Sequence, residues 1–233
     1  MKLQTQIPFK QQASNQIDYH SKLILLGSCF SENIGDQLAY HKFQTIVNPF
    51  GILFHPKAIE RLISNALNCK IYTDNDVFFL NERWHTFDAH SSFSCTDKNQ
   101  LITRLNTAIT HTKVQLENAS HIVITLGTSW VYRFIESGIP VANCHKVSQK
   151  QFSKELLSVQ ATIKSLQTII KTVQSINNNV TFTLTVSPVR HLKDGFIENQ
   201  QSKAHLLTAV HHIIASHRTV HYFPAYEIMM DEL

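Results

Sequence analysis

Short runs of apolar residues alternate with longer stretches of helical periodicity along this chain. The apolar or β-branched runs span residues 22–26, 121–126, 180–186 and 219–223, and a turn signal follows each of the first three, as in parallel strands covered on both faces. Helical patterns span residues 32–41, 56–67, 97–117, 151–176 and 199–217. The alternation predicts an α/β fold with a doubly wound, mostly parallel sheet.

Two stretches interrupt this alternation. Between residues 71 and 94, Phe78, Trp84 and Phe93 lie among polar residues without a sustained helical or strand period, so we expect a hairpin or a long insertion near the functional site. Another hairpin is expected around Ser137 and Gly138, because both residues favour tight turns. No internal repeat or linker divides the chain, and we expect one domain over residues 1–233.

The composition is that of a globular protein with a substantial core. Of 233 residues, 43% are hydrophobic, which suits a single core. Lysine and arginine number 21 against 17 acidic residues, and the formal charge of +4 forms no basic block, so nucleic acid is not an expected partner. The first residues lack a signal-peptide pattern and no run reaches transmembrane length. We therefore expect a cytoplasmic protein without membrane association.

The potential metal ligands do not show the spacing of a metal site. Asp88 and His90 are two residues apart in the sequence. They could be a pair of metal ligands or part of a loop that lines a pocket, and no third ligand has a diagnostic spacing. His145 follows the second expected hairpin and is expected to pack in a loop. We expect no metal, and keep these three residues as candidates for substrate binding or for an alternative base.

The four cysteines are far apart and lack C-x-x-C spacing, which is typical of reduced structural thiols: Cys29, Cys69, Cys95 and Cys144.

The first apolar run leads directly into a helical pattern through Gly27, Ser28 and Cys29. At such a turn the Ser28 hydroxyl stands at the carboxyl end of a strand and the amino end of a helix, where backbone donors and the helix dipole favour a developing oxyanion. Ser28 is therefore the candidate nucleophile. The simpler alternative is a helix N-cap, a role that serine fills well. Cys29 is a rival nucleophile, because a helix N-terminus lowers the pKa of a thiol.

Polar clusters follow two further strands. Gly127 and Ser129 come after the second strand, and Arg190 and His191 come after the third. Ligands of open parallel sheets bind beyond the carboxyl ends of the strands, so these clusters are expected to converge with Ser28. Arg190 could hold a substrate carboxylate or phosphate, or form an internal salt bridge. His191 could contact the substrate, act as a base or hydrogen-bond a loop.

Six segments of the chain resemble the GSCFA family, which is named after a pentapeptide whose final alanine is Ser31 here. The resemblance covers nearly the whole chain. The segments are Gly27-Ser28-Cys29-Phe30, Asn48-Pro49-Phe50-Gly51-Ile52-Leu53, Phe87-Asp88-Ala89-His90-Ser91, Leu126-Gly127-Thr128-Ser129-Trp130-Val131-Tyr132, Val141-Ala142-Asn143-Cys144-His145-Lys146 and Thr185-Val186-Ser187-Pro188-Val189-Arg190-His191-Leu192-Lys193-Asp194-Gly195.

GSCFA proteins are grouped with the SGNH (GDSL-like) hydrolases, and this relationship implies a flavodoxin-like three-layer α/β/α sandwich and cofactor-free serine ester hydrolysis. Carried over residue by residue, Ser28 matches the nucleophile. Gly51 and Gly127 match the glycines of the second and third sequence blocks, and their N–H groups are expected to form the oxyanion hole together with the N–H of Ser28 and the hydroxyl of Ser129. The usual asparagine of the third block is replaced by Ser129, whose hydroxyl can donate one hydrogen bond over a shorter reach.

The resemblance also implies a catalytic base that this sequence does not contain. SGNH enzymes supply it from an Asp-x-x-His motif near the carboxyl terminus, and the chain reaches Leu233 without one. Three explanations stay open: a truncated sequence, a protein without the usual base, or substitution by His191 or another histidine. General-base assistance is worth about 10²–10⁴-fold in rate, so without a base the chain is expected to be nearly inert.

We therefore expect a serine-dependent hydrolase of an acyl or O-acetyl ester, with a small-molecule or carbohydrate substrate. Two alternatives use the same strand-end pocket. One is a non-catalytic module that binds an acylated or glycan ligand, and the other is an O-acyltransferase in which a sugar hydroxyl replaces water. The sequence does not indicate an oligomeric state.

Overall fold

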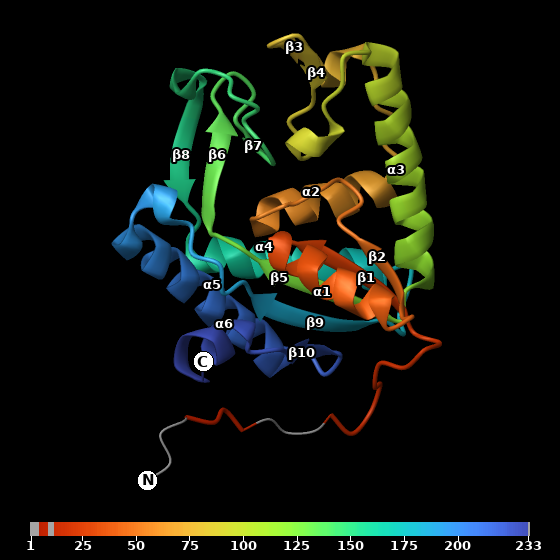
Figure 1. Cartoon of the computed structure of the whole chain (residues 1–233), viewed down its shortest axis with the longest axis vertical. Coiled ribbons are helices and arrows are strands. Elements are labelled where there is room, and N and C mark those ends of the chain that lie inside the picture. Colours follow the sequence, from red (N-terminus) through yellow and green to blue (C-terminus); the bar gives the residue numbers. More distant parts are fainter. Residues whose placement is uncertain (1–4, 9–11, 233) are drawn as a thin grey trace.

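A five-stranded parallel sheet forms the centre of the computed structural model, which describes residues 5–8 and 12–232 (Figure 1). Its order is β2-β1-β5-β9-β10, which is the flavodoxin-like order 2-1-3-4-5 when these strands are counted along the chain. All four strand pairs are parallel. The strands are β1 (Lys22–Gly27), β2 (Gln44–Val47), β5 (His121–Leu126), β9 (Thr181–Val186) and β10 (Val220–Tyr222).

Helices cover both faces of this sheet and give the predicted three-layer α/β/α architecture. In Figure 1, α1 lies in front of the sheet and α4 behind it. Consecutive members of the series α3, α2, α4 and α5 contact one another, and α1 packs on β1 and β2. The helices are α1 (Cys29–Tyr40), α2 (Pro56–Leu67), α3 (Lys98–Asn118), α4 (Val159–Gln174), α5 (Phe196–Ser216) and α6 (Ala225–Glu227).

Short helical turns complete the connections. Four of them are 3₁₀ turns, and the last, near the described C-terminal end, is a π turn. They are η1 (Asp74–Asp76), η2 (Ser91–Phe93), η3 (Gln149–Gln151), η4 (Leu192–Asp194) and η5 (Ile228–Glu232).

The helix starts follow the capping residues in the sequence. Ser28, His55, Asp97 and Ser158 each accept a hydrogen bond from a first-turn N–H group of the helix that follows. The prediction of a helix over residues 151–176 is wrong in its first part, because residues 152–156 form a strand. The helix begins only after Ser158, whose cap stops the helical pattern from extending backward.

Two antiparallel excursions rise from one end of the layered core (Figure 1). The first is a hairpin of β3 (Phe78–Leu80) and β4 (Arg83–His85), whose turn residues Asn81 and Glu82 have φ values of 49° and 61°. The second is a sheet of β6 (Trp130–Phe134), β7 (Ile139–Val141) and β8 (Phe152–Leu156). Both expected hairpins are present, but no residue between 71 and 94 lines the cavity described below, so the predicted nearness of the first hairpin to the site is not confirmed. Strands β2 and β8 were not predicted.

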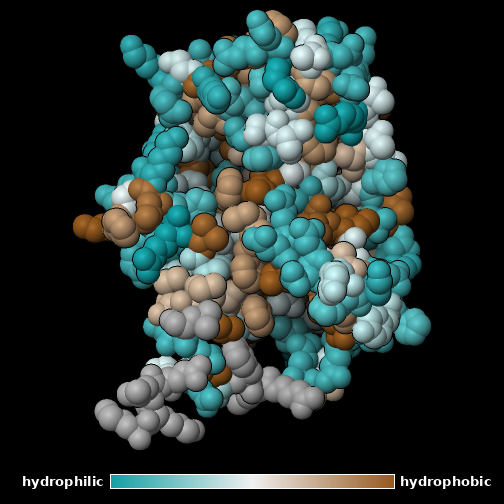
Figure 2. All heavy atoms as spheres, viewed as in Figure 1, coloured by the Kyte–Doolittle hydropathy of each residue, from teal (hydrophilic) through white to brown (hydrophobic). Residues whose placement is uncertain are grey.

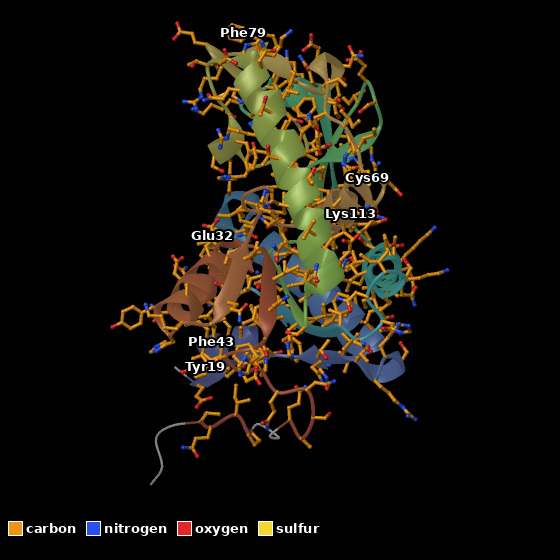
Figure 3. The ribbon with its side chains drawn as sticks, turned by 90° about the vertical axis from the view of Figure 1, so that its right-hand side faces the viewer. Tyr19, Glu32, Phe43, Cys69, Phe79 and Lys113 are labelled. Atoms are coloured by element: carbon orange, nitrogen blue, oxygen red, sulfur yellow. The ribbon has the colours of Figure 1, made fainter. Side chains whose placement is uncertain are left out.

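Figure 3 shows the length of α3 beside these excursions, with Phe79 at the far tip of the β3–β4 hairpin. Near the opposite end of the molecule, Tyr19 stacks on Phe43 with ring centroids 4.7 Å apart. This contact holds the segment before β1 against the start of β2. None of the described helices is both long and apolar enough to cross a lipid bilayer.

Candidate functional site

The candidate site lies at the carboxyl edge of the sheet, where β1 and β5 are neighbours. The chain leaves β1 toward β2 on one side and leaves β5 toward β9 on the other, so this edge contains the topological switch point of the sheet. Ligands of open α/β sheets bind at such points. Ser28, Gly127 and Ser187 directly follow the three central strands and are therefore neighbours at this edge.

Gly27 makes the turn that presents Ser28 possible. Its φ is +131°, and a Cβ atom at this position would lie 2.0 Å from the carbonyl oxygen of Thr125. The Ser28 N–H donates to the same oxygen at 3.1 Å. The Ser28 Oγ atom accepts a hydrogen bond from the Phe30 N–H at 3.3 Å, so Ser28 caps α1 in this conformation. The side chain has no exposed surface.

The segment of residues 48–55 is hydrogen-bonded to this corner. The Gly27 N–H donates to Asn48 Oδ1 at 2.8 Å, and the Leu53 N–H donates to the Gly27 carbonyl at 2.9 Å. The Phe54 carbonyl then accepts hydrogen bonds from the N–H groups of Gly127 and Thr128, at 2.8 and 3.1 Å. Because it is bonded to both strand ends that flank Ser28, we infer that this segment separates Ser28 from solvent.

Like the Ser28 N–H, the three other groups expected to form the oxyanion hole all have partners in this conformation. The Gly51 N–H donates to the Asn48 carbonyl at 2.7 Å, and the Gly127 N–H donates to Phe54 as described above. The Ser129 hydroxyl donates to the Ser202 carbonyl at 2.8 Å and has no exposed surface. These groups therefore stabilise the fold of the strand ends here, and an oxyanion role for them would require a different conformation.

A cavity of about 560 Å³ opens beside the strand ends, within the usual range for ligand pockets. It lies between the end of β5, the base of β6 and the loop that leads from β9 to α5. In Figure 2, apolar side chains project at the left-hand tip, where α5 begins in Figure 1. The cavity is lined by residues that include Phe54, Thr128, Trp130, Tyr132, Cys144, Arg190, His191 and Lys193.

His191 connects this cavity with the Gly127 corner. Its Nε2 atom lies 3.1 Å from the position that a Cβ on Gly127 would occupy, and its ring packs edge-on against Phe54 at 5.1 Å. Nε2 is buried and has no hydrogen-bond partner among the described residues. Burial and, secondarily, the charge of Lys203 lower the pKa of His191 below its usual 6.5. The imidazole is therefore neutral at neutral pH.

Sequence reasoning missed a polar face on α5 that holds the strand ends together. Asn199, Ser202 and Lys203 are all buried. Asn199 Oδ1 accepts the His191 N–H at 2.8 Å, and Ser202 Oγ accepts the Ser129 N–H at 2.7 Å. These three residues stand at positions i, i+3 and i+4, so they share one helix face with the apolar residues that follow them. This shared face is the sequence signal that could have revealed them.

Lys203 is the charged member of this face and has no exposed surface. Its Nζ atom donates to the carbonyl oxygens of Gly127 and Ser187, both at 2.7 Å. Burial lowers the pKa of Lys203 to about 7, and the nearby Cys29 thiol opposes this shift. Burial thus brings the pKa of a lysine, a residue that is charged in most proteins, into the neutral range at the edge where the nucleophile was predicted.

Asp88, His90 and His145 lie outside this cavity. The Asp88 carboxylate forms ion pairs with Arg61 at 2.6 Å and Lys70 at 3.2 Å. His90 caps η2, and its N–H donates to the Phe50 carbonyl. Asp88 lines a separate cavity of about 650 Å³, and the roles of these residues in substrate binding or as a base stay predictions.

His145 is held by the loop beside β4, as its simplest interpretation predicted. Its Nε2 atom lies 2.7 Å from the carbonyl oxygen of Thr86, and burial lowers its pKa to about 4. Among the described residues, no group of three histidine, cysteine or acidic side chains is arranged to hold a metal ion.

Comparisons with known proteins identify one family. A family model described as GSCFA family matches residues 22–233 of the chain, which includes every strand and helix described above. Searches of curated proteins and of solved structures return no match.

Proposed function

The chain belongs to the GSCFA family, and we propose that it is a serine-dependent ester hydrolase with Ser28 as the nucleophile. The observation that supports this proposal is the meeting of three features at one sheet edge. Ser28 follows β1 at the switch point, Gly127 follows the adjacent strand, and the neutral His191 packs against Gly127 with a free Nε2 atom.

The reaction uses two steps. The Ser28 Oγ attacks the acyl carbonyl carbon while His191 Nε2 takes the hydroxyl proton, and His191 then gives this proton to the leaving alcohol as the ester bond breaks. Water next attacks the acyl-enzyme, with its proton taken by His191 and returned to Ser28 as the acid leaves. His191 is the described histidine best suited to this role, because its unpaired Nε2 atom lies beside Gly127 at the edge of the cavity, whereas His145, which also has an unpaired ring nitrogen, lies outside it.

The first turn of α1 supplies the charge stabilisation in this proposal. The first N–H groups of a helix lack intrahelical partners, and the helix dipole adds positive potential at this end. Because Ser28 caps α1, an oxyanion formed on its acyl group develops close to these donors. This assignment replaces the groups of Gly51, Gly127 and Ser129, whose partners belong to other residues of the fold, whereas the Phe30 N–H is bonded to the Ser28 Oγ itself.

Substrate access requires a conformational step, because Ser28 is fully buried. In our proposal the segment of residues 48–55 moves, and the contact between Phe54 and His191 opens toward the cavity. Loop motions of this kind commonly gate active sites. The four cysteines are unpaired, which supports the expectation of a reducing, cytoplasmic environment.

The proposal is tested with hydrolysis of 4-nitrophenyl acetate by the purified protein. Ser28→Ala is expected to lower kcat by about 10³-fold or more, whereas Cys29→Ala, at the adjacent free thiol, should retain activity. Loss of activity in Cys29→Ala with retention in Ser28→Ala would assign the reaction to the rival nucleophile. An unchanged rate in both variants would refute catalysis at this corner.

A non-catalytic binding module is the second candidate, and the burial of Ser28 favours it. In this function the cavity beside the strand ends holds a ligand, and Ser28 serves only as the cap of α1. This alternative would be supported if the wild-type protein binds a ligand but has no esterase activity, and if Ser28→Ala binds the same ligand equally well.

A further inference from the structure

The cavity beside the strand ends carries unbalanced positive charge. Arg190 and Lys193 line it and are both exposed, and neither has an ion-pair partner in the described part of the chain. The one acidic residue in the lining is Asp194, and Lys154 already pairs with it. The charges of the lining therefore do not cancel.

Arg190 resolves an alternative that the sequence left open, between an internal salt bridge and substrate binding. Its guanidinium contacts the Met230 sulfur at 3.4 Å, and a thioether is only a weak acceptor. No carboxylate lies within ion-pair distance of Arg190 among residues 5–8 and 12–232. Its planar fork of N–H donors is thus available to a ligand.

Lys193 reaches the same space from the next turn of the loop. Its charge acts on the Cys144 thiol, where it opposes the effect of burial, which raises the pKa of Cys144 to about 11. Cys144 and Lys193 both line the cavity. The positive potential of Lys193 therefore extends into the cavity, where it would attract an anion.

We propose that Arg190 and Lys193 form an anion subsite at this cavity, and that the substrate carries a carboxylate or phosphate group beside its ester. The substrate class rests on the proposed hydrolase function, whereas the anion subsite does not. Two side chains on one loop contact the anion, Arg190 through paired N–H donors and Lys193 as a point charge. The aromatic side chains of Trp130 and Tyr132 provide a wall for the uncharged part of the substrate.

The test compares three phenyl esters that differ in charge: phenyl acetate, 4-acetoxybenzoate and 4-acetoxyphenyl phosphate. The variant is Arg190→Gln/Lys193→Gln, which removes both cations from exposed positions. The matched control is Lys171→Gln/Arg218→Gln, which makes the same change of charge at two exposed positions. Both positions lie at the opposite, amino edge of the sheet, Lys171 in the last turn of α4 and Arg218 just before β10.

The wild-type protein should hydrolyse at least one anionic ester with a lower KM than phenyl acetate. The site variant should raise the KM for that ester by about tenfold to a hundredfold, as expected for lost hydrogen bonds to charged groups, and change the KM of phenyl acetate by less than about threefold. Preference for the benzoate or for the phosphate identifies which anion fits. Equal KM values for all three esters, or equal effects of the two double variants, would overturn the proposal.

Binding measurements keep the subsite testable if no ester is hydrolysed. In that case the proposed function fails, and calorimetry with 4-hydroxybenzoate and phenyl phosphate decides on the subsite alone. The subsite would be supported if the wild-type protein and the control variant bind either anion and the affinity of the site variant is lower by about tenfold or more. Absence of binding, or equal binding by all three proteins, would refute it.

Discussion

Lys203 donates a hydrogen bond of 2.7 Å to the carbonyl oxygen of Gly127, although the lysine has no exposed surface. A second bond of the same length reaches the Ser187 carbonyl, so one amino group joins the ends of β5 and β9. Burying a lysine costs free energy because its charged form loses hydration. The two bonds offset part of this cost and fix the separation of two corners of the candidate site.

Replacement of Lys203 by methionine should change how stability depends on pH. The pKa of Lys203 is about 7 in the folded protein and near 10.5 when unfolded. Between these values the unfolded chain binds more protons, so stability rises with pH, by about 2 kcal/mol from pH 7 to pH 9. His191 is already neutral in this range. The other close groups are the Cys29 thiol, whose charge acts on Lys203, and Tyr226, whose ring centre is 6.0 Å from Nζ.

Urea unfolding of wild type and Lys203→Met at pH 7 and pH 9 measures this effect. The variant leaves two buried carbonyls without their donor, at a cost of about 1–3 kcal/mol each, and its loss of stability should be larger at pH 9. Lys171→Met, at an exposed position of α4, controls for the substitution itself. A loss that is equal at both pH values would show that Lys203 is not the titrating group.

Gly27→Ala should destabilise the protein strongly, because the added Cβ would lie 2.0 Å from a backbone oxygen of the neighbouring strand, at a φ of +131°. Backbone strain and overpacking together should lower the free energy of unfolding by about 3 kcal/mol or more. Gly138→Ala is the matched control: its φ is +66° and its Cβ would have no neighbour within 4 Å. Denaturant unfolding should show that Gly138→Ala lowers the free energy of unfolding by about 1 kcal/mol. Equal losses in the two variants would contradict the close approach of Gly27 to the neighbouring strand.

His191→Gln should lower kcat/KM by about 10²–10⁴-fold if His191 is the base. Because the pKa of His191 is lowered from its usual 6.5, the midpoint of the acid limb in the wild-type profile of kcat/KM should lie below pH 6.5, where the imidazole gains a proton. The glutamine variant should lack this acid limb.

His111→Gln, at an exposed position of α3, should behave as wild type. Retention of both the rate and the acid limb in His191→Gln would exclude His191 as the base.

Most of the fold could be predicted from the sequence, because buried parallel strands are continuous apolar runs. β1, β5 and β9 are of this kind, and each lies in the middle of the sheet. The edge strand β2 was missed because Gln44 and Thr45 interrupt its apolar character and it is only partly buried. In β8, polar residues follow Phe152 and resemble the start of a helix, and only the cap at Ser158 separates the strand from α4.

The candidate site was predictable only in part. Strand ends could be assigned to one sheet edge, which brought Ser28, Gly127 and His191 together. Hydrogen bonds between distant segments could not be read from spacing, so the partners of Ser129 and the burial of Ser28 were not foreseen. Lys203 was missed because a lysine in a helix is normally solvated, and only tertiary packing reveals that this one is buried.

Covalent labelling of the native protein with a fluorophosphonate, mapped by mass spectrometry, tests the nucleophilic role of Ser28 most directly. We expect one phosphonyl group per chain on Ser28, formed slowly because the segment of residues 48–55 must open, and none on Ser28→Ala. A folded wild-type protein that stays unmodified at Ser28 after prolonged incubation, or that carries the label on Cys29, would contradict it.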